Sequence, residues 1–390
     1  MAGIRVLVVD DSVVIRRVLC EALATDPAIE AVVSAADGSI ALSKIPLVNP
    51  DLITLDVEMP GMSGIETLAA IRKTYPKLPV IMFSTLTERG ASITLEALSL
   101  GASDYLAKPQ NTGSLEQTRE RIRLELIPKV KGLCRKNEEG KLPPAIRPEP
   151  RKAANVKRSA AAERVDVVAI GTSTGGPNAL SVVLPALVAE TPVPIVVVQH
   201  MPPLFTRLLA ERLDKLSSIA IREGAEGDVL QPGHAWIAPG DFHMKLAREG
   251  KAVRLTMSQE APQNSCRPAV DVLFESVAQV YGANALAVVL TGMGSDGVRG
   301  AQRIKEAGGQ VIAQDEATSV VWGMPGQVAA AGLAEGVFPL QEIAGEIDRR
   351  ANRNRLLADR KASGILPEEK GSSRTERSSS SVEPISKQQR

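Results

Sequence analysis

The sequence is poor in the residues that build disulfide-rich, zinc-binding or aromatic-rich proteins. Its 390 residues include 3 cysteines and 3 histidines, and aromatic residues make up 3%. Cys20, Cys134 and Cys266 are far apart and show no paired spacing, which argues against a disulfide framework and a cysteine-rich zinc site. The core must therefore be aliphatic, and few imidazoles are available for catalysis.

Long apolar segments and an excess of one charge are also lacking. The longest apolar stretches, such as 195–198 and 285–290, fall far short of the roughly 18 residues that a membrane helix needs. The first residues do not have the pattern of a secretory signal. Lys plus Arg total 46 and Asp plus Glu total 45, so net charge gives no reason to expect a nucleic-acid ligand. We expect a cytoplasmic protein that neither inserts into a membrane nor binds nucleic acid.

Two segments alternate short apolar runs with helical patterns, as in parallel sheets that are covered by helices on both faces. We expect the first domain over residues 1–125 and the second over 164–357. In the first, the expected strands are 4–9, 31–35, 52–55, 80–83 and 105–107, and the helices include 12–24, 64–74 and 91–100. In the second, they are 165–170, 195–199, 235–237, 285–290 and 310–313, with helices near 178–188, 205–215, 270–281 and 297–307.

The region between these segments has a different composition. Residues 129–164 contain eleven Lys or Arg against four Glu, together with several prolines and no apolar period. This pattern predicts an exposed basic linker over 126–163; docking to an anionic surface is the alternative role. Residues 358–390 are rich in Ser, Lys and Glu and are predicted to be a disordered polar tail.

Polar groups end several strands of the first domain. Asp10 and Asp11 follow the first strand, Asp56 ends the third, Ser84 ends the fourth and Lys108 follows the fifth. Parallel strands bring these groups to one sheet edge. Clustered carboxylates need a cation such as Mg²⁺, and a hydroxyl with an ammonium group can hold phosphoryl oxygens. Each aspartate alone is equally typical of a helix cap or turn.

The motifs at 9–12 (VDDS), 56–64 (DVEMPGMSG) and 108–109 (KP) resemble the signature of response-regulator receiver domains. The resemblance implies that Asp56 accepts a phosphoryl group from a histidine kinase. It also implies that Asp56 and the two aspartates after the first strand hold Mg²⁺.

The same resemblance assigns three supporting positions. It implies that Ser84 and Lys108 contact the phosphoryl group, and Tyr105 matches the switch aromatic of the family.

A glycine-rich turn follows the first strand of the second domain, at 171–177 (GTSTGGP). Such a turn before a helix can present backbone N–H groups to a phosphate, but the spacing fits neither a Walker-type loop nor the dinucleotide fingerprint. The alternative is a nucleophilic serine, Ser173, exposed on a tight turn. The motif alone leaves both functions open.

A serine nucleophile needs a base and an orienting carboxylate. His200 directly follows the strand 195–199, at the same predicted sheet edge as Ser173, whereas His234 and His243 flank a turn-rich segment and can be loop histidines. Asp296 lies beyond the strand 285–290 and can orient the imidazole or cap the next helix. The glycine-rich loop around Asp296 can also direct N–H groups at an oxyanion.

Four motifs together resemble the chemotaxis protein-glutamate methylesterase family, CheB: 171–176 (GTSTGG), 199–202 (QHMP), 238–244 (APGDFHM) and 291–297 (TGMGSDG). The order of receiver, linker and hydrolase matches too. The resemblance implies that Ser173, His200 and Asp296 are the catalytic triad, supported at the oxyanion by Thr174 and Met293. It implies an α/β fold with two doubly wound parallel-sheet domains, a flavodoxin-like receiver and a Rossmann-like serine hydrolase, joined by the basic linker.

The resemblance further implies a phosphorylation-activated serine hydrolase of a two-component phosphorelay in chemotaxis adaptation. Its substrates would be glutamyl methyl esters on the cytoplasmic helices of methylated chemoreceptors, which lose methanol, and receptor glutamines, which lose ammonia. The receiver would use Mg²⁺, and the hydrolase chemistry no cofactor. Other receiver-linked hydrolases, a nucleotide-binding regulator and a DNA-binding output are the alternatives, although a helix-turn-helix output would be shorter and mostly helical.

One position departs from the family. Cys266 stands where related sequences tend to carry a histidine. We expect this departure to leave the triad intact and to affect substrate contacts near Arg267. Cys266 itself is not expected to be a nucleophile, because it does not end a predicted strand.

Overall fold

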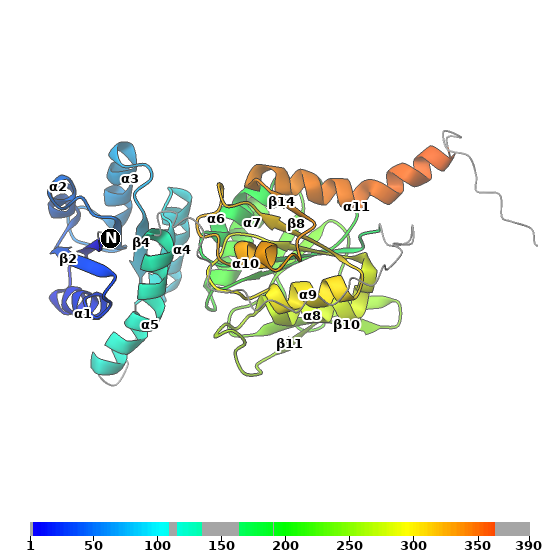
Figure 1. The fold of residues 1–390 in the computed structure, drawn as a ribbon, viewed down its shortest axis with the longest axis horizontal. Coiled ribbons are helices and arrows are strands. Elements are labelled where there is room, and N and C mark those ends of the chain that lie inside the picture. The colour runs from blue at the N-terminus through cyan, green and yellow to red at the C-terminus, as the bar shows by residue number, and fades with distance from the viewer. Residues whose placement is uncertain (1–2, 109–114, 135–163, 190, 363–390) are drawn as a thin grey trace, which may run out of the picture.

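The computed structural model describes residues 3–108, 115–134, 164–189 and 191–362, and these form two α/β domains that lie side by side (Figure 1). The first domain runs from blue to cyan in Figure 1, and the second from green to orange. The α/β architecture with two parallel sheets is confirmed.

Within its described residues, the first domain has a five-stranded parallel sheet in the order β2-β1-β3-β4-β5. The strands are β1 (Ile4–Val9), β2 (Ile29–Ala35), β3 (Leu52–Asp56), β4 (Val80–Ser84) and β5 (Asp104–Ala107). The helices are α1 (Val13–Leu23), α2 (Gly38–Val48), α3 (Gly64–Thr74), α4 (Glu88–Ser99) and α5 (Leu115–Cys134). β1 and β3 are fully buried over Val6–Val9 and Leu52–Asp56, as expected for strands covered on both faces.

The second domain has a seven-stranded parallel sheet in the order β14-β13-β12-β6-β7-β9-β8 within its described residues. The strands are β6 (Val167–Thr172), β7 (Ile195–Gln199), β8 (Ala220–Glu223), β9 (His234–Ile237), β12 (Ala285–Val289), β13 (Gln310–Gln314) and β14 (Gly336–Phe338). The helices are α6 (Gly176–Val183), α7 (Phe205–Leu216), α8 (Val270–Tyr281), α9 (Val298–Glu306), α10 (Met324–Ala330) and α11 (Leu340–Ala362), with a short 3₁₀ turn at Gly282–Asn284. The order of the strands reverses around β6, and such switch points open a crevice at the carboxyl ends of the strands.

An antiparallel hairpin of β10 (His243–Glu249) and β11 (Ala252–Ser258) stands outside this sheet. Its apolar side chains Met244, Leu246, Val253 and Leu255 are buried in the same cluster as residues of α8. The hairpin was not predicted, and its packing fixes the segment that leads from β11 to α8.

Two predicted boundaries need correction. The linker was expected from residue 126, but α5 runs to Cys134, because Ile122, Leu126, Ile127 and Val130 share one buried face that packs with α1. The tail was expected from 358, but α11 continues to Ala362. The remaining parts of the predicted linker and tail, 135–163 and 363–390, lie outside the described residues.

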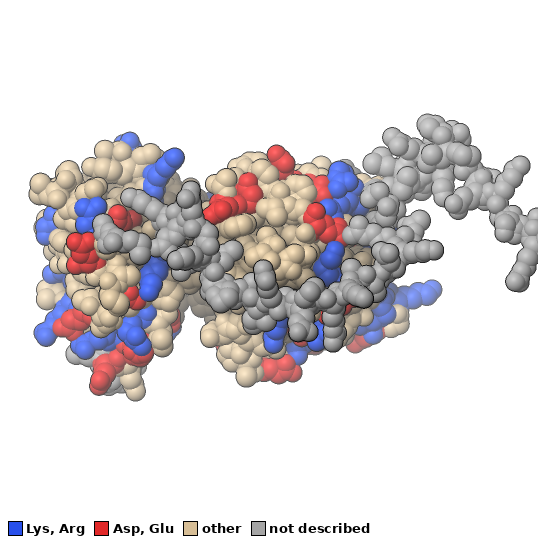
Figure 2. Space-filling model, viewed as in Figure 1, with Lys and Arg blue, Asp and Glu red and all other residues tan. Residues whose placement is uncertain are grey.

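Charged side chains are interspersed on the visible face of both domains (Figure 2), consistent with the formal net charge of +1. Among the helices that the structure describes, none is long and apolar enough to span a bilayer.

The two domains share buried contacts. One cluster of buried apolar side chains includes members of both sheets, among them Leu55 of β3 and Val168 of β6. Where the domains meet, the ring of Tyr105 stacks on that of Phe205, with ring centroids 4.7 Å apart and an interplanar angle of 10°. Helix α4 lies against α6 and α7 at this junction.

Candidate active site and phosphorylation site

The carboxyl edge of the first sheet brings two aspartates and a lysine together. Lys108 Nζ lies 2.7 Å from Asp56 Oδ2 and 3.1 Å from Asp10 Oδ2. Asp10 and Asp56 are buried, and Asp11 is exposed at the mouth of the cluster. The predicted convergence of these strand-end groups is therefore present in the structure.

The electrostatics of this cluster leave it short of positive charge. Burial raises the pKa of Asp56 to about 6; Asp10 adds to the rise and Lys108 opposes it. The Oδ2 atoms of Asp10 and Asp56 are buried, yet neither accepts a hydrogen bond of good geometry from a described residue. One oxygen from each of Asp10, Asp11 and Asp56 lies within 4.8 Å of the others. This all-oxygen donor set fits a hard divalent cation.

Ser84 and Tyr105 have partners outside the cluster of Asp10, Asp56 and Lys108. The Ser84 hydroxyl donates to Gly90 O at 3.1 Å, at the start of α4. Tyr105 is buried against Phe205 of the second domain. A phosphoryl contact from Ser84 would thus require its hydroxyl to leave the Gly90 carbonyl.

The register of the second sheet places Ser173 beside His200. Thr172 and Gln199 are paired in the β6–β7 ladder, so the next residue of each strand lies at the same edge. His200 N donates to Thr172 O at 3.2 Å, and Ser173 N donates to Thr291 O at 3.1 Å. The tight turn after Ser173 uses Gly175 at φ 78°, a conformation that favours glycine.

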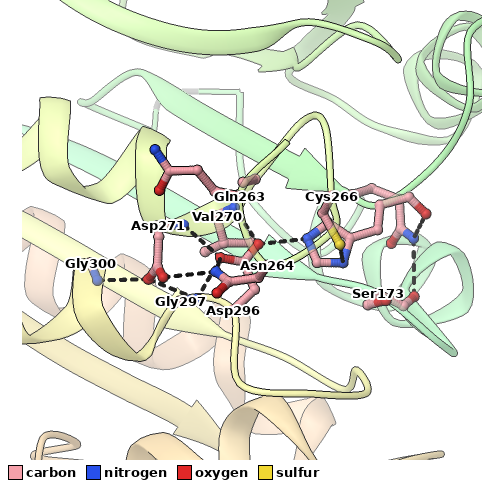
Figure 3. Close-up of polar contacts among 12 residues, drawn as sticks. Ser173, Gln263, Asn264, Cys266, Val270, Asp271, Asp296, Gly297 and Gly300 are labelled. Carbon is pink, nitrogen blue, oxygen red and sulfur yellow. Dashed lines mark hydrogen bonds and ion pairs between the residues drawn. The ribbon is translucent and has the colours of Figure 1, made fainter. Parts of the chain in front are cut away.

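Asp296 holds the imidazole from one side (Figure 3). His200 Nε2 lies 2.8 Å from Asp296 Oδ2, and the ionised carboxylate can only accept this hydrogen bond. Four further donors bind the same carboxylate, at distances from 2.7 to 3.0 Å: the side-chain amide of Asn264 and the backbone N–H groups of Val270, Asp271 and Gly297. Burial by itself raises the pKa of Asp296, but the hydrogen bonds outweigh it and hold the pKa below its ordinary value.

Cys266 occupies the other side of the imidazole. Its Sγ lies 3.5 Å from His200 Nδ1. Burial lowers the pKa of His200, but hydrogen bonds to Asp296 and Cys266 outweigh this and raise it to about 9. The departure at Cys266 was expected to leave the triad unaffected, whereas the structure brings the thiol into contact with the predicted base.

Three residues that share this corner, His200, Cys266 and Asp296, have potential metal-ligand atoms within 4.8 Å of one another. Their arrangement does not fit a metal ion. Both oxygens of Asp296 are already used by five donors, and the sulfur and the carboxylate face different nitrogens of the same ring.

Two backbone N–H groups near Ser173 are free to bind an oxyanion. Neither Thr174 N nor Met293 N donates a backbone hydrogen bond to any residue that the structure describes. The surrounding loops are fixed by other bonds: Gln199 Nε2 donates to Ser173 O at 3.0 Å, and Thr291 Oγ1 donates to Thr174 O at 3.0 Å.

The other two histidines have local partners. The ring of His234, which is half-buried, contacts Pro232 O at 3.0 Å. His243 is fully buried, accepts a hydrogen bond from Ala269 N at Nδ1 and contacts Ala261 O through Nε2. The sequence left open that both are loop histidines, whereas His234 begins β9 and His243 begins β10.

Comparisons with known proteins find the same two domains. The model of the CheB methylesterase family matches residues 168–347, and that of the response regulator receiver domain matches residues 6–120. A protein-glutamate methylesterase/protein-glutamine glutaminase of Trichodesmium erythraeum is 53% identical over 353 residues, covering 90% of this chain and 99% of the relative. The chain belongs to the CheB methylesterase family.

A second relative of the same name, from a Nocardioides species, is 51% identical over 91% of this chain and 97% of its own length. The crystal structure of the Thermotoga maritima CheB methylesterase catalytic domain is 44% identical and covers 47% of this chain and 98% of that one, with a TM-score of 0.47. As in other receiver domains, a divalent metal belongs to the phosphorylation site of this CheB family member.

In this CheB family chain the receiver contacts the hydrolase directly beside Ser173. Thr174 Oγ1 donates to Asp104 Oδ2 at 2.9 Å in a buried hydrogen bond, and Asp104 also pairs with Lys129 of α5. At the rim, Arg207 Nη2 lies 3.1 Å from Glu88 Oε1. No sequence pattern marks these contacts, because they depend on how the two domains dock.

Proposed function

We propose that this chain is a protein-glutamate methylesterase and protein-glutamine glutaminase of chemotaxis adaptation, activated by phosphorylation of its receiver domain. The observation that carries the proposal is the His200–Asp296 pair, held at the sheet edge where Ser173 sits on a glycine turn. The substrates are methyl-esterified glutamates and glutamines on chemoreceptor helices, as the names of the relatives suggest. We place the reaction in the cytoplasm.

In the proposed mechanism Ser173 Oγ attacks the ester carbonyl while His200 takes its proton. Nε2 of His200 is engaged by Asp296, so the proton goes to Nδ1. The N–H groups of Thr174 and Met293 bind the oxyanion. His200 then protonates the departing methanol, and water hydrolyses the acyl-enzyme. With a glutamine substrate, ammonia leaves in place of methanol.

The high pKa of His200 makes catalysis depend on its protonation state. A ring that is protonated below about pH 9 cannot accept the serine proton. Binding of substrate would displace the Cys266 contact from Nδ1 and remove one of the two hydrogen bonds that raise this pKa.

The triad is tested by methanol release from a methyl-esterified receptor. Ser173→Ala should lower the rate by at least about 10⁴-fold, because the nucleophile is lost. Ser181→Ala is the matched control, since the Ser181 hydroxyl donates to Pro177 O within α6, and it should keep the wild-type rate. Methanol release by Ser173→Ala at the wild-type rate would contradict the serine mechanism, and no release by the wild type would favour the nucleotide-binding alternative.

For regulation, we propose that the unphosphorylated receiver blocks access of a helical substrate to Ser173. The contacts Thr174–Asp104 and Tyr105–Phe205 support this, because they put the receiver against the turn that carries the nucleophile. Phosphorylation of Asp56 adds charge beside Lys108. A shift of Lys108 and Ser84 toward the phosphoryl group and of Tyr105 away from Phe205 would weaken the interface.

Mg²⁺ is the proposed ion of the receiver, held by Asp10, Asp11 and Asp56, where it offsets negative charge at the phosphoryl group. The hydrolase chemistry is proposed to need no cofactor. A histidine kinase is the proposed phosphodonor.

Regulation is tested on the full chain with a small-molecule phosphodonor and Mg²⁺. Tyr105→Ala should raise basal methanol release about five-fold and reduce the further stimulation, since a stacked aromatic pair contributes roughly 1 kcal/mol. Tyr75→Ala, at the end of α3 in the same domain, controls for loss of an aromatic ring. Basal release by Tyr105→Ala equal to that of the wild type would contradict the blocking role of this contact.

A further inference from the structure

The imidazole of His200 contacts a group with nucleophile chemistry other than Ser173, the thiol of Cys266. Cys266 Sγ lies 3.5 Å from Nδ1 of His200, whose Nε2 is fixed by Asp296 at 2.8 Å. Cys266, His200 and Asp296 thus repeat the order of nucleophile, base and orienter with sulfur in place of the serine oxygen. In Figure 3 the Cys266 side chain is drawn between those of Asp296 and Ser173.

The loop holds this thiol in place and leaves it accessible. Gln263 and Cys266 close a tight turn with two backbone hydrogen bonds, of 3.1 and 2.8 Å. The two residues between them, Asn264 and Ser265, are exposed and have φ values of 51° and 62°. Cys266 itself is half-buried. A small reagent can therefore reach the sulfur, while the turn keeps it on the imidazole.

The imidazole of His200 is the partner of the Cys266 sulfur. A protonated His200 donates to the sulfur, and a thiolate beside an imidazolium is the reactive form of cysteine. The other two cysteines have different surroundings. Burial raises the pKa of the Cys20 thiol, and the Cys134 thiol donates to the carbonyl of Asp51 at 3.6 Å.

We propose that Cys266 is a reversible oxidation site at which hydroperoxides switch off hydrolysis. The proposal rests on the proposed role of His200 as the base for Ser173. The Cys266 thiolate attacks one oxygen of hydrogen peroxide and the O–O bond breaks. This gives a sulfenic acid and hydroxide, which takes the proton of the His200 imidazolium and becomes water. Sulfur loses two electrons and the peroxide gains them.

The modified side chain acts through the hydrogen bond that it already makes. A sulfenic acid at Cys266 donates its O–H to Nδ1 of His200, so this nitrogen cannot accept the proton of Ser173. Low-molecular-weight thiols reverse the change: the first forms a mixed disulfide with Cys266 and releases water, and the second regenerates the Cys266 thiol and leaves as a disulfide.

The test treats the purified full-length protein with hydrogen peroxide, with and without dimedone to trap sulfenic acid. Methanol release is measured and the labelled residue is identified by mass spectrometry. Each variant is compared with its own untreated rate. In the wild type and in the double variant Cys20→Ser, Cys134→Ser, peroxide should lower the rate at least ten-fold. Both proteins should carry dimedone at Cys266. When dimedone is omitted, dithiothreitol should restore their rates. Cys266→Ala and Cys266→Ser should retain their rates within two-fold.

Three outcomes would overturn the inference: no dimedone on Cys266, a wild-type rate that survives labelling of Cys266, or equal loss in the two Cys266 variants. Failure of the underlying site assignment is distinguishable, because it would appear in untreated protein as methanol release by Ser173→Ala. Dimedone labelling reports on the thiol independently of that result.

Discussion

Asp56 and Asp296 occupy equivalent places in the two domains and have opposite environments. Each is buried at the carboxyl edge of a parallel sheet, beside a side chain that can carry positive charge. Asp56 Oδ2 has the ion pair with Lys108 as its partner, and the pKa of Asp56 is raised to about 6, mainly by burial. Asp296 accepts from five donors, and its pKa is lowered.

The contrast fits the two proposed roles, a carboxylate that reacts (Asp56) and a carboxylate that positions (Asp296). A carboxylate short of hydrogen bonds gains from a cation or a phosphoryl partner, so its environment changes between states. A carboxylate that is saturated with donors has nothing to gain, and in the proposed mechanism it fixes the orientation of His200 throughout the reaction. In the proposed function, the same sheet edge thus serves as a switch in one domain and as a rigid catalytic frame in the other.

The largest effect is expected from Asp296→Asn. The amide cannot accept all five hydrogen bonds and favours the wrong tautomer of His200, so kcat should fall about 10⁴-fold. Asp271→Asn is the matched control, because Asp271 belongs to the same network through Gly297 and Gly300 but does not contact His200. A loss of kcat in Asp271→Asn equal to that in Asp296→Asn would mean that loop folding, rather than orientation of the imidazole, accounts for the effect.

The pH dependence of hydrolysis should follow His200. Because the pKa of this base is about 9, kcat/KM should rise about 50-fold between pH 7 and pH 9. Cys266→Ala should move the rise to lower pH, since Cys266 contributes to the raised pKa. Receptor incubated with Ser173→Ala corrects for spontaneous ester hydrolysis. A flat wild-type profile over this range would contradict the assignment of His200 as the base.

The contribution of His200 to folding stability should fall as pH rises, whereas hydrolysis should become faster. The pKa of His200 is raised from 6.5, so its contribution to folding is complete below pH 6.5 and is lost as pH rises through about 9. The raised pKa of Asp56 also disfavours its charged form in the folded state, and this penalty grows from pH 3.8 and is complete above about pH 6.

At pH 7.5, Asp56→Asn should therefore raise the free energy of unfolding by about 1–2 kcal/mol, measured by denaturant titration without divalent ions. The expected gain in stability arises because the substitution removes a carboxylate charge that is buried next to Asp10. Mg²⁺ should stabilise the wild type and have little effect on Asp56→Asn. Destabilisation by Asp56→Asn would show that the pair with Lys108 outweighs the cost of burial.

The smallest effect is expected at the rim of the domain interface. The Arg207 and Glu88 side chains are 44% and 71% exposed, and such pairs contribute less than about 1 kcal/mol. Glu88→Gln should change basal methanol release by less than about two-fold, with Glu96→Gln on the same helix as a control. A change as large as that of Tyr105→Ala would mean that the charged rim, rather than the stacked rings, holds the domains together.

The parts that follow from strand order could be predicted from the sequence. The strands β1, β3, β6, β7 and β12 are continuous apolar runs, and parallel order places the residues after them at one edge. This rule suffices to bring Lys108 to Asp56 and Asp10, to bring Asp296 to His200, and to place Ser173 at the same sheet edge as His200. The helices α3 and α8 were predicted with their observed bounds. Each has a buried apolar face that is visible as a helical pattern in the sequence.

The parts of the structure that depend on loops and on domain docking could not be predicted from the sequence. Cys266 reaches His200 through a turn of two non-glycine residues at positive φ, which no residue pattern marks. The strands of the hairpin β10–β11 are only partly buried and carry charged side chains, so no continuous apolar run marks them. The Thr174–Asp104 contact joins residues of different domains, so it follows from the fit of two surfaces rather than from a local motif.

The contrast between the two aspartates is tested most directly by one assay of methanol release from methylated receptor, with and without a small-molecule phosphodonor. Wild type, Asp56→Ala and Asp296→Ala are measured side by side in the full chain. Asp56→Ala should keep the basal rate and lose all stimulation, while Asp296→Ala should lose at least about 10³-fold of both rates. Stimulation that persists in Asp56→Ala, or a wild-type rate in Asp296→Ala, would contradict the account.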